Sequence, residues 1–167
     1  AYHLHPYTDL LRHRESGPHV IVRGDGVRVI DEDGKSYIEG MSGLWCAALG
    51  FSEKRFAAAA ARQMETLPFY HSFTGRVPDV IVDLAEKLIG MAPVPMSKVL
   101  FCNSGSEAND TALKLVRQFN NLGGRPEKKK MIARKGGYHG VTMGAGSLTG
   151  LAHTHSGFDL PIPGIVH

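Results

Sequence analysis

The stretch that most constrains the fold is residues 99–110, which reads Val-Leu-Phe-Cys-Asn-Ser-Gly-Ser-Glu-Ala-Asn-Asp. Residues 99–102 form a continuous apolar run, as expected of a short strand that is covered on both faces. Small polar residues follow, and apolar side chains then recur at helical spacing over residues 108–122. Two glycines end this helix, and residues 130–134 resume as a strand. The pattern therefore predicts one βαβ unit with a right-handed crossover.

The junction between this strand and helix has the chemistry of an anion site. The first N–H groups of a helix lack internal partners, and the helix dipole places partial positive charge there. Gly105 allows a ligand to approach the backbone closely, and the hydroxyls of Ser104 and Ser106 add possible donors. A phosphate is the obvious guest for such a site, but the local residues by themselves favour an ordinary N-cap, because Ser-rich caps are common without a ligand. No P-loop lysine follows, so the turn is a poor match for nucleoside triphosphates.

Composition places the chain among globular domains, or pieces of larger ones, because its 167 residues are 43% hydrophobic and 21% charged. The net charge is +3, and the one basic run, residues 128–130, contains no aromatic residue. We interpret it as a solvated turn and expect no nucleic-acid partner. No apolar run approaches membrane-spanning length, and the first residues lack a signal-peptide core, so no membrane partner is expected either. The absence of an initiator methionine suggests that the native N-terminus lies upstream.

The two cysteines and the histidines give no sign of a disulfide or a metal centre. Cys46 and Cys102 both lie in apolar contexts, which is typical of reduced core residues in an intracellular protein, and we expect a cytoplasmic location. His153 and His155 are two residues apart in a predicted loop, with no cysteine or carboxylate cluster nearby. This spacing does not favour a metal site.

The first 50 residues read as an arm followed by a small sheet. Residues 1–18 have no clear period, apart from a short helical piece near residues 8–13. Three short alternating runs, residues 19–23, 27–30 and 35–39, are separated by Asp-Gly turns and predict a β-meander. Residues 40–50 are an apolar loop that contains Trp45, which either packs in a core or lines a pocket.

Two helices precede the predicted βαβ unit. Ser52 is the expected N-cap of a helix over residues 53–66, and Pro78 opens a second helix over residues 79–91. Between them, residues 67–73 gather aromatic side chains, which suggests an interface or a substrate wall, or else a buried satellite cluster.

The last part of the chain continues the expected sheet. Residues 136–140 leave the second strand at the carboxyl end of the sheet, where ligands of open α/β folds gather. Residues 141–148 predict a short helix interrupted by glycine, and residues 165–167 predict the start of another strand.

Six segments together resemble the class III family of pyridoxal-phosphate-dependent aminotransferases, especially its ω-amino acid:pyruvate or amine transaminase group. They occur in the family's order and at its spacing, and they extend over the whole chain. The segments are Leu-His-Pro-Tyr (4–7), Met-Ser-Gly-Leu-Trp-Cys (41–46), Leu-Pro-Phe-Tyr (67–70), Asn-Ser-Gly-Ser-Glu-Ala (103–108), Gly-Tyr-His-Gly (137–140) and Asp-Leu-Pro-Ile-Pro-Gly (159–164).

The resemblance assigns a cofactor-binding role to four residues. It implies that Gly105 and Ser106 hold the phosphate of pyridoxal 5'-phosphate, that Tyr138 stacks on the pyridine ring, and that His139 lies beside it. Glu107 should point away from this site, because a carboxylate in the first turn suits the helix dipole but repels a phosphate.

The same resemblance implies a substrate pocket formed with a second subunit. Trp45 would form a wall of the pocket and Tyr7 would lie near it. Phe73 occupies the position from which the family sends an aromatic side chain across the dimer interface. We therefore expect a homodimer with shared active sites.

The resemblance also implies a fold and an incomplete set of catalytic residues. The fold is α/β, the fold-type-I arrangement of pyridoxal-phosphate-dependent transferases, in which a mostly parallel sheet is flanked by helices. Residues 1–50 would be the arm and meander of the small domain, and residues 51–167 the first part of the cofactor-binding large domain. No catalytic residue is expected in this chain, because the Schiff-base lysine and the acid that pairs with the pyridine nitrogen are expected beyond residue 167.

The activity implied for the complete protein is transfer of an amino group from an amine or ω-amino acid donor to a keto acid such as pyruvate. Two alternatives stay on the same cofactor scaffold, an aminomutase and a decarboxylase. A third is a non-catalytic phosphate-binding βαβ module, and a fourth is a truncated paralogue that serves only as a partner.

Overall fold

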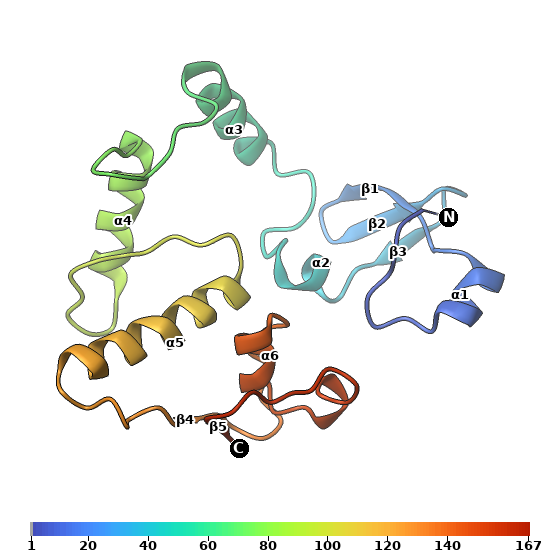
Figure 1. The fold of residues 1–167 in the computed structure, drawn as a ribbon. Helices are drawn as coiled ribbons and strands as arrows, with labels where there is room; N and C mark the ends of the chain where they lie inside the picture. Colours follow the sequence, from blue (N-terminus) through green and yellow to red (C-terminus); the bar gives the residue numbers. More distant parts are fainter. Residues whose placement is uncertain (1) are drawn as a thin grey trace. The chain divides into compact units, whose positions relative to one another are not determined.

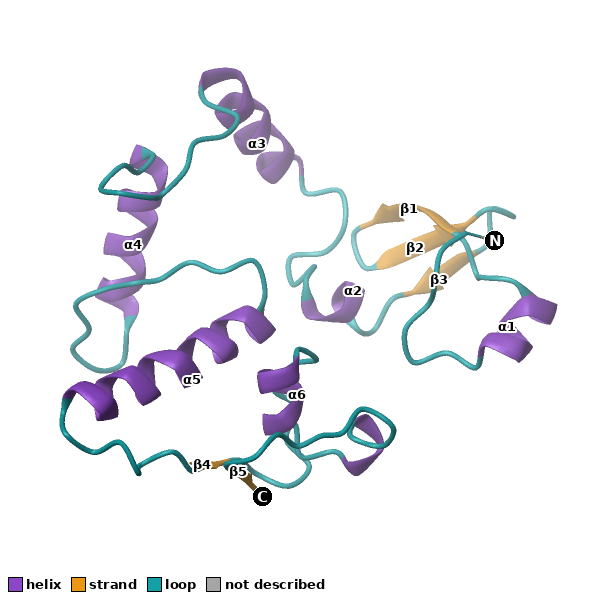
Figure 2. Cartoon of the chain, in the orientation of Figure 1, coloured by secondary structure: helices purple, strands orange, loops and turns teal. Residues whose placement is uncertain are grey.

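The computed structural model describes residues 2–167, which fall into two compact units, one ending at Pro78 and the other covering Asp79–His167 (Figure 1). Helices and loops account for most of both units, and the strands are short (Figure 2). None of the helices in the described residues is long and apolar enough to cross a membrane.

The first unit is built on a three-stranded antiparallel sheet of β1 (Ile21–Asp25), β2 (Arg28–Asp31) and β3 (Ser36–Ile38), in that order. The predicted β-meander is therefore confirmed. Helix α1 (Leu10–Ser16) precedes the sheet, and the carboxylate of Asp9 caps it by accepting from the amide of Leu11 at 3.0 Å. Among the described residues of this unit, the buried apolar residues are Val29 on β2 and Pro78 at the end of the unit.

Two helical segments follow the sheet, α2 (Ser42–Trp45) and α3 (Lys54–Thr66). The prediction that Ser52 caps α3 is wrong. Ser52 has a positive φ of 65°, and its hydroxyl donates to the carbonyl of Gly24 on β1. Glu53 takes the N-cap position and accepts from the amide of Arg55 at 3.0 Å, because the Ser52 side chain is already committed to the sheet.

The second unit contains α4 (Asp79–Met91), α5 (Gly105–Leu122), β4 (Met131–Ile132), α6 (Met143–Leu148), a short 3-10 helix η1 (Ala152–Thr154) and β5 (Ile165–Val166). Strands β4 and β5 pair in parallel, with Met131 opposite Ile165 and Ile132 opposite Val166. The strands predicted near residues 130–134 and 165–167 are thus confirmed. The parallel connection runs from β4 through α6 to β5.

The strand predicted over residues 99–102 is absent. The backbone there has no strand partner within the described residues, and Leu100 is 66% exposed. An apolar run becomes a strand only when a neighbour supplies hydrogen bonds, and β4 pairs with β5 instead. The βαβ unit predicted around α5 is therefore incomplete, because residues 99–102, just before the helix, form no strand in the part of the chain that the structure describes.

The buried apolar residues of the second unit are small in number and lie close to β4 and β5: Ala133, Ala145 and Ile165. Both cysteines are free and exposed, so the prediction that they are core residues is wrong for this chain.

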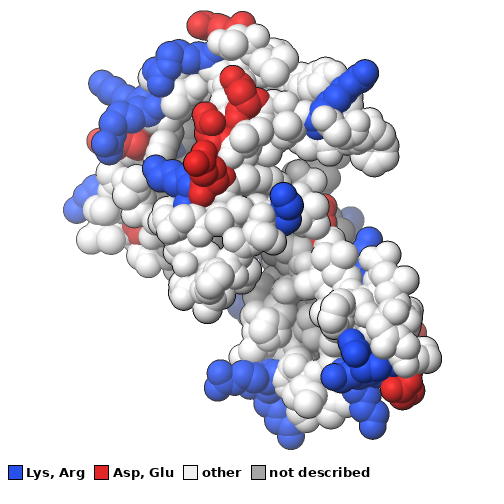
Figure 3. Space-filling model, turned by 90° about the vertical axis from the view of Figure 1, so that its left-hand side faces the viewer, with Lys and Arg blue, Asp and Glu red and all other residues white. Residues whose placement is uncertain are grey.

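Large uncharged areas separate the Lys, Arg, Asp and Glu side chains on the face drawn in Figure 3. Many of the exposed side chains are large and apolar, which identifies surfaces that other protein normally covers.

Candidate functional site

The start of helix α5 is held by a reciprocal pair of side-chain hydrogen bonds. The hydroxyl of Ser104, the N-cap, accepts from the amide of Glu107 at 3.1 Å. The carboxylate of Glu107 reaches back and accepts from the amide of Asn103 at 2.9 Å. This arrangement is a capping box whose second bond falls one residue earlier than usual. The Glu107 carboxylate is thus bound to donors of the preceding turn. This agrees with the expectation that it points away from a phosphate at the helix start.

The capping leaves two amides at the helix start without a partner. Within residues 2–167, neither the N–H of Gly105 nor that of Ser106 has an acceptor. No heavy atom lies within 4 Å of the position that a Cβ of Gly105 would take, so this approach to the backbone is open. The hydroxyl oxygen of Ser106 accepts from the amide of Val141 at 3.1 Å, which leaves its O–H available as a donor. Two N–H groups and one O–H at a helix N-terminus suit a phosphate.

The loop between β4 and α6 is attached to the first turns of α5. The side-chain amide of Asn109 donates to the carbonyl of His139 at 2.6 Å. The carboxylate of Asp110 accepts from the amide of Ala145, in the first turn of α6 just after the loop, at 2.8 Å. Together with the bond from Val141 to Ser106, these contacts fix the loop beside the helix start.

Gly140 makes this close approach possible. Its φ is +125°, and a Cβ there would collide with the Ser106 hydroxyl and lie 2.9 Å from the Cβ of Ala145. The carbonyl of Gly140 accepts from the fully buried hydroxyl of Thr149 at 2.9 Å, and the same hydroxyl accepts from the amide of His139 at 2.9 Å. The loop is therefore held from the α5 side and from the α6 side.

The structure thus brings the four residues predicted to bind the cofactor to one place in the second unit. Gly105 and Ser106 form the helix start, and Tyr138 and His139 belong to the loop attached to it. Tyr138 is 57% exposed, so the packing of this unit leaves the residue accessible.

Trp45 lies in the first unit, at the end of a left-handed backbone turn. Ser42, Gly43, Leu44 and Trp45 have φ values of 51°, 60°, 57° and 71°, so α2 is a left-handed helical turn. Such a conformation costs about 1–2 kcal/mol for each non-glycine residue. Trp45 itself is 77% exposed, which excludes a core role in this chain. Strained backbone of this kind is concentrated at functional sites.

The turn belongs to a loop whose two ends are fixed at neighbouring residues of the sheet. At its start, the amide of Glu39 donates to the carbonyl of Val27 at 2.9 Å. At its end, Phe51 and Gly26 exchange backbone hydrogen bonds, with the Phe51 amide 2.7 Å from the Gly26 carbonyl. Because Gly26 and Val27 are adjacent in the β1–β2 turn, the segment closes on itself like an Ω-loop.

The remaining predicted pocket residues, Tyr7 and Phe73, lie in exposed loops of the first unit. Tyr7 has a positive φ of 53°. Phe69 and Phe73 are among the most exposed aromatic residues, so residues 67–73 do not form a buried cluster in this chain.

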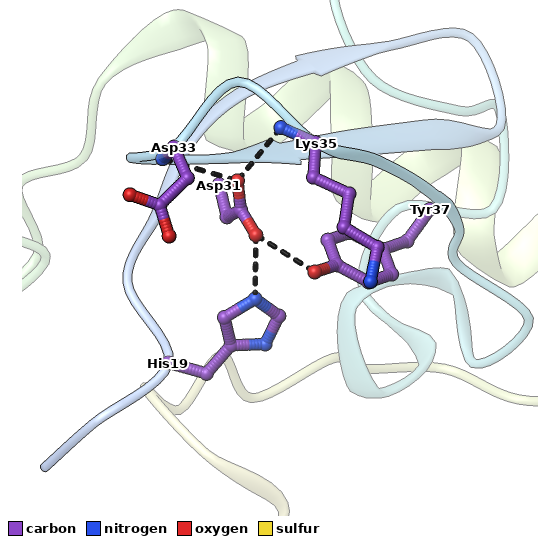
Figure 4. Close-up of polar contacts among 5 residues, drawn as sticks. All are labelled: His19, Asp31, Asp33, Lys35 and Tyr37. Atoms are coloured by element: carbon purple, nitrogen blue, oxygen red, sulfur yellow. Dashed lines mark hydrogen bonds and ion pairs between the residues drawn. The ribbon is translucent and has the colours of Figure 1, made fainter.

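A buried carboxylate that was not among the predicted site residues, Asp31, lies at the end of β2 (Figure 4). It is 4% exposed and accepts hydrogen bonds from the hydroxyl of Tyr37 at 2.7 Å, the ring of His19 at 3.1 Å and the amide of Lys35 at 2.8 Å. The bond from Tyr37 is the main cause that lowers the pKa of Asp31 to about 2, and the bonds from His19 and Lys35 add to it. An aspartate that opens an Asp-x-Asp-Gly turn was the available signal, because such side chains bind the following amides.

Comparison with known proteins identifies the family. The model of the family "Aminotransferase class-III" matches residues 11–167 of the chain. The chain belongs to this family. The family membership agrees with the resemblance carried by the six segments. Within residues 2–167 there is no group of three or more metal-ligating side chains.

Three similar proteins show what this part of the family looks like. Gamma-aminobutyrate transaminase 1, mitochondrial, from Oryza sativa subsp. indica is 50% identical over 98% of this chain and 32% of its own length. Putrescine–pyruvate aminotransferase from Pseudomonas aeruginosa is 42% identical over 99% of this chain and 36% of its own length. An omega transaminase from Pseudomonas jessenii, solved in complex with PMP, is 58% identical with a TM-score of 0.98, over 99% of this chain and 37% of that one. The fold is therefore that of the omega transaminases, fold type I, and the chain spans about a third of the length of these relatives.

Proposed function

We propose that the complete protein is a pyridoxal-phosphate-dependent aminotransferase. It transfers an amino group from an amine or ω-amino acid donor to a keto acid such as pyruvate. The names of the relatives support transamination over the aminomutase and decarboxylase alternatives. The observation that carries the proposal is the pair of unpartnered amides of Gly105 and Ser106 beside the attached Tyr138 loop.

The residues present fit the cofactor. The amides of Gly105 and Ser106 and the Ser106 hydroxyl would hold the phosphate, and the Glu107 carboxylate is kept away from it by Asn103. Tyr138 would cover one face of the pyridine ring, since its ring is exposed while its backbone is fixed, and His139 would lie beside it. When bound, pyridoxal phosphate supplies an electron sink for the substrate carbon that carries the amino group.

In this proposal, residues 1–167 bind and orient the cofactor and the substrate, and a lysine beyond residue 167 carries out the proton transfers. Trp45, Tyr7 and Phe73 would shape the substrate pocket, and the protein would be a homodimer in which Phe73 serves the neighbouring site. The exposure of all three aromatic side chains supports a role in contacts outside their own unit. Residues 1–50 would belong to the small domain and residues 51–167 to the large one.

We also propose a cytoplasmic location. The two free thiols, Cys46 and Cys102, are exposed, and exposed thiols persist unpaired in a reducing compartment. Fractionation of cells that express the protein from its own gene would test this, and recovery with an organelle or with secreted material would contradict it.

The central test compares two neighbouring serines in the full-length protein. Ser106→Ala removes a proposed phosphate donor and should weaken retention of pyridoxal phosphate by about 1–2 kcal/mol, the size of a hydrogen bond to a charged group. Ser104→Ala is the matched control. The sequence also offered the Ser104 hydroxyl as a phosphate donor, but in the structure this hydroxyl caps the helix by accepting from the Glu107 amide, and it is not among the groups proposed here to hold the phosphate. Cofactor affinity is measured by visible absorbance during dilution, together with amino transfer from an amine to pyruvate. Equal losses from the two variants, or a wild-type protein without amino transfer, would refute the proposal.

A further inference from the structure

The left-handed turn of α2 (Ser42–Trp45) is not explained by its own hydrogen bonds. The Trp45 amide donates to the Met41 carbonyl at 2.8 Å, and the Ala47 amide donates to the Ser42 carbonyl at 2.7 Å. A right-handed turn would make the same kind of bonds without placing Ser, Leu and Trp at positive φ. Some other contact must therefore select the left hand.

The carboxylate of Glu39 makes that contact. One of its oxygens accepts from the amide of Met41 at 2.8 Å, and the other accepts from the amide of Gly43, inside the turn. Its backbone is fixed in turn, since the Glu39 amide donates to Val27 at the edge of the sheet. Glu39 thus joins the sheet to the two amides at the beginning of the left-handed turn.

The orientation of Trp45 depends on this turn. The Trp45 side chain is 77% exposed, so packing within its unit does not fix its direction. The hand of the backbone decides where its Cα–Cβ bond points. The other end of the loop is closed by Phe51 on Gly26, so the loop cannot relax by moving as a whole.

We propose that Glu39 is a positioning residue for substrate selectivity, which holds the left-handed turn through Met41 and Gly43 and thereby directs Trp45. The proposal rests on the proposed function, in which Trp45 forms a wall of the amine pocket. Glu39 itself touches neither substrate nor cofactor in this account. Its effect should therefore appear in discrimination between amines of different size, and it should vanish when the Trp45 side chain is absent.

The test is a double-mutant cycle in the full-length holoenzyme with Glu39→Gln, Trp45→Ala and the pair. The readout is the ratio of kcat/KM for a bulky aromatic amine to that for a small aliphatic amine, with pyruvate as acceptor. In Glu39 each carboxylate oxygen accepts from a different amide. Glutamine is uncharged and replaces one of these oxygens by an NH2 group that only donates, so one of the two bonds is lost, and the ratio should change by about tenfold, as for loss of one hydrogen bond to a charged acceptor. In the Trp45→Ala background, the same change should alter the ratio by less than twofold. Glu32→Gln, at an exposed glutamate of the same unit, is the matched control and should leave the ratio unchanged.

Two further variants keep the test decisive if Glu39→Gln does not fold. Glu39→Asp retains the charge but is one methylene shorter, and it should shift the ratio in the same direction. Adding Ser42→Asn to either variant should restore the wild-type ratio, because asparagine tolerates the left-handed region. An unchanged ratio in folded Glu39 variants, a shift that persists without the Trp45 side chain, or no rescue by Ser42→Asn would overturn the positioning role. If Trp45→Ala alone leaves the ratio unchanged, the proposed pocket fails as well, and the two failures are thereby distinguished.

Discussion

Replacement of Gly140 by alanine should detach the loop between β4 and α6 from the start of α5. Two costs add at this position. A non-glycine residue at φ +125° adopts a sparsely populated conformation that costs about 1–3 kcal/mol. The new methyl would also collide with the Ser106 hydroxyl and lie 3.0 Å from the Ser106 Cα and 2.9 Å from the Ala145 Cβ. Overpacking of this kind costs about 1–3 kcal/mol, so the total is about 2–6 kcal/mol.

Hydrogen exchange at two amides reports this loss directly. The Val141 amide is protected by the Ser106 hydroxyl and the Ala145 amide by the Asp110 carboxylate, and both bonds break when the loop leaves the helix. A loss of about 2 kcal/mol or more in the free energy of local opening corresponds to at least about 30-fold faster exchange. The measurement uses the full-length protein without cofactor, so that the loop is not held by a ligand. With cofactor, the same variant should show weaker retention of pyridoxal phosphate.

Gly136→Ala is the matched control. Gly136 also has a positive φ, +74°, but nothing lies within 4 Å of the position of its added Cβ. It should therefore lose only the conformational term, about 1–2 kcal/mol. If Gly140→Ala accelerates exchange at Val141 no more than Gly136→Ala does, the steric argument for the attachment of the loop is refuted.

Three other outcomes are expected. Tyr138→Ala should shift the cofactor absorbance and slow transamination, whereas Tyr138→Phe should be milder because stacking survives; equal damage would assign the role to the hydroxyl. For Asp31, the hydrogen bonds from Tyr37, His19 and Lys35 outweigh the opposing effect of burial and lower its pKa from 3.8 to about 2, so its stabilisation is present above about pH 4 and is lost as the pH falls towards 2. The stability difference between wild type and Asp31→Asn, from denaturant unfolding, should therefore shrink over that range, and a constant difference would contradict it. A polypeptide of residues 1–167 alone should bind apolar dyes and show no amino transfer, and a cooperative melt of a monomer would contradict this.

The sequence pattern of neighbouring residues was sufficient to predict an element where the segment contains its own start and stop signals. Pro78 precedes the predicted helix over residues 79–91, and α4 has those bounds. The helix over α5 ends at Leu122 with Gly123 as its C-cap, as the paired glycines predict. The β-meander was predicted from alternation and Asp-Gly turns, which act over a few residues.

Local rules failed where distant residues decide the conformation. Ser52 has the chemistry of an N-cap, but its hydroxyl bonds to Gly24, which is 28 residues earlier. Residues 99–102 have the composition of a strand, but a strand needs a partner, and the run alone does not provide one. The left-handed turn at Trp45 opposes the local preference of Ser, Leu and Trp, so only the contacts of Glu39 and the closed loop account for it.

The accessible surface explains why the candidate site is open in this chain. The solvent-accessible surface of the chain is 13656 Å². A compact monomer of 18.1 kDa would expose about 8,100 Å², and two separate compact units, each of half that mass, would together expose about 9,700 Å². The excess over the two-unit value is about 4,000 Å² on this chain alone, which is more than the roughly 1,000–2,500 Å² that one partner contributes to a permanent interface. Trp45, Phe73 and Tyr138 are all part of this exposed apolar surface. The side chains proposed to meet substrate and cofactor are therefore among those that need a covering surface, and we expect the pocket to acquire its shape only when that cover is present.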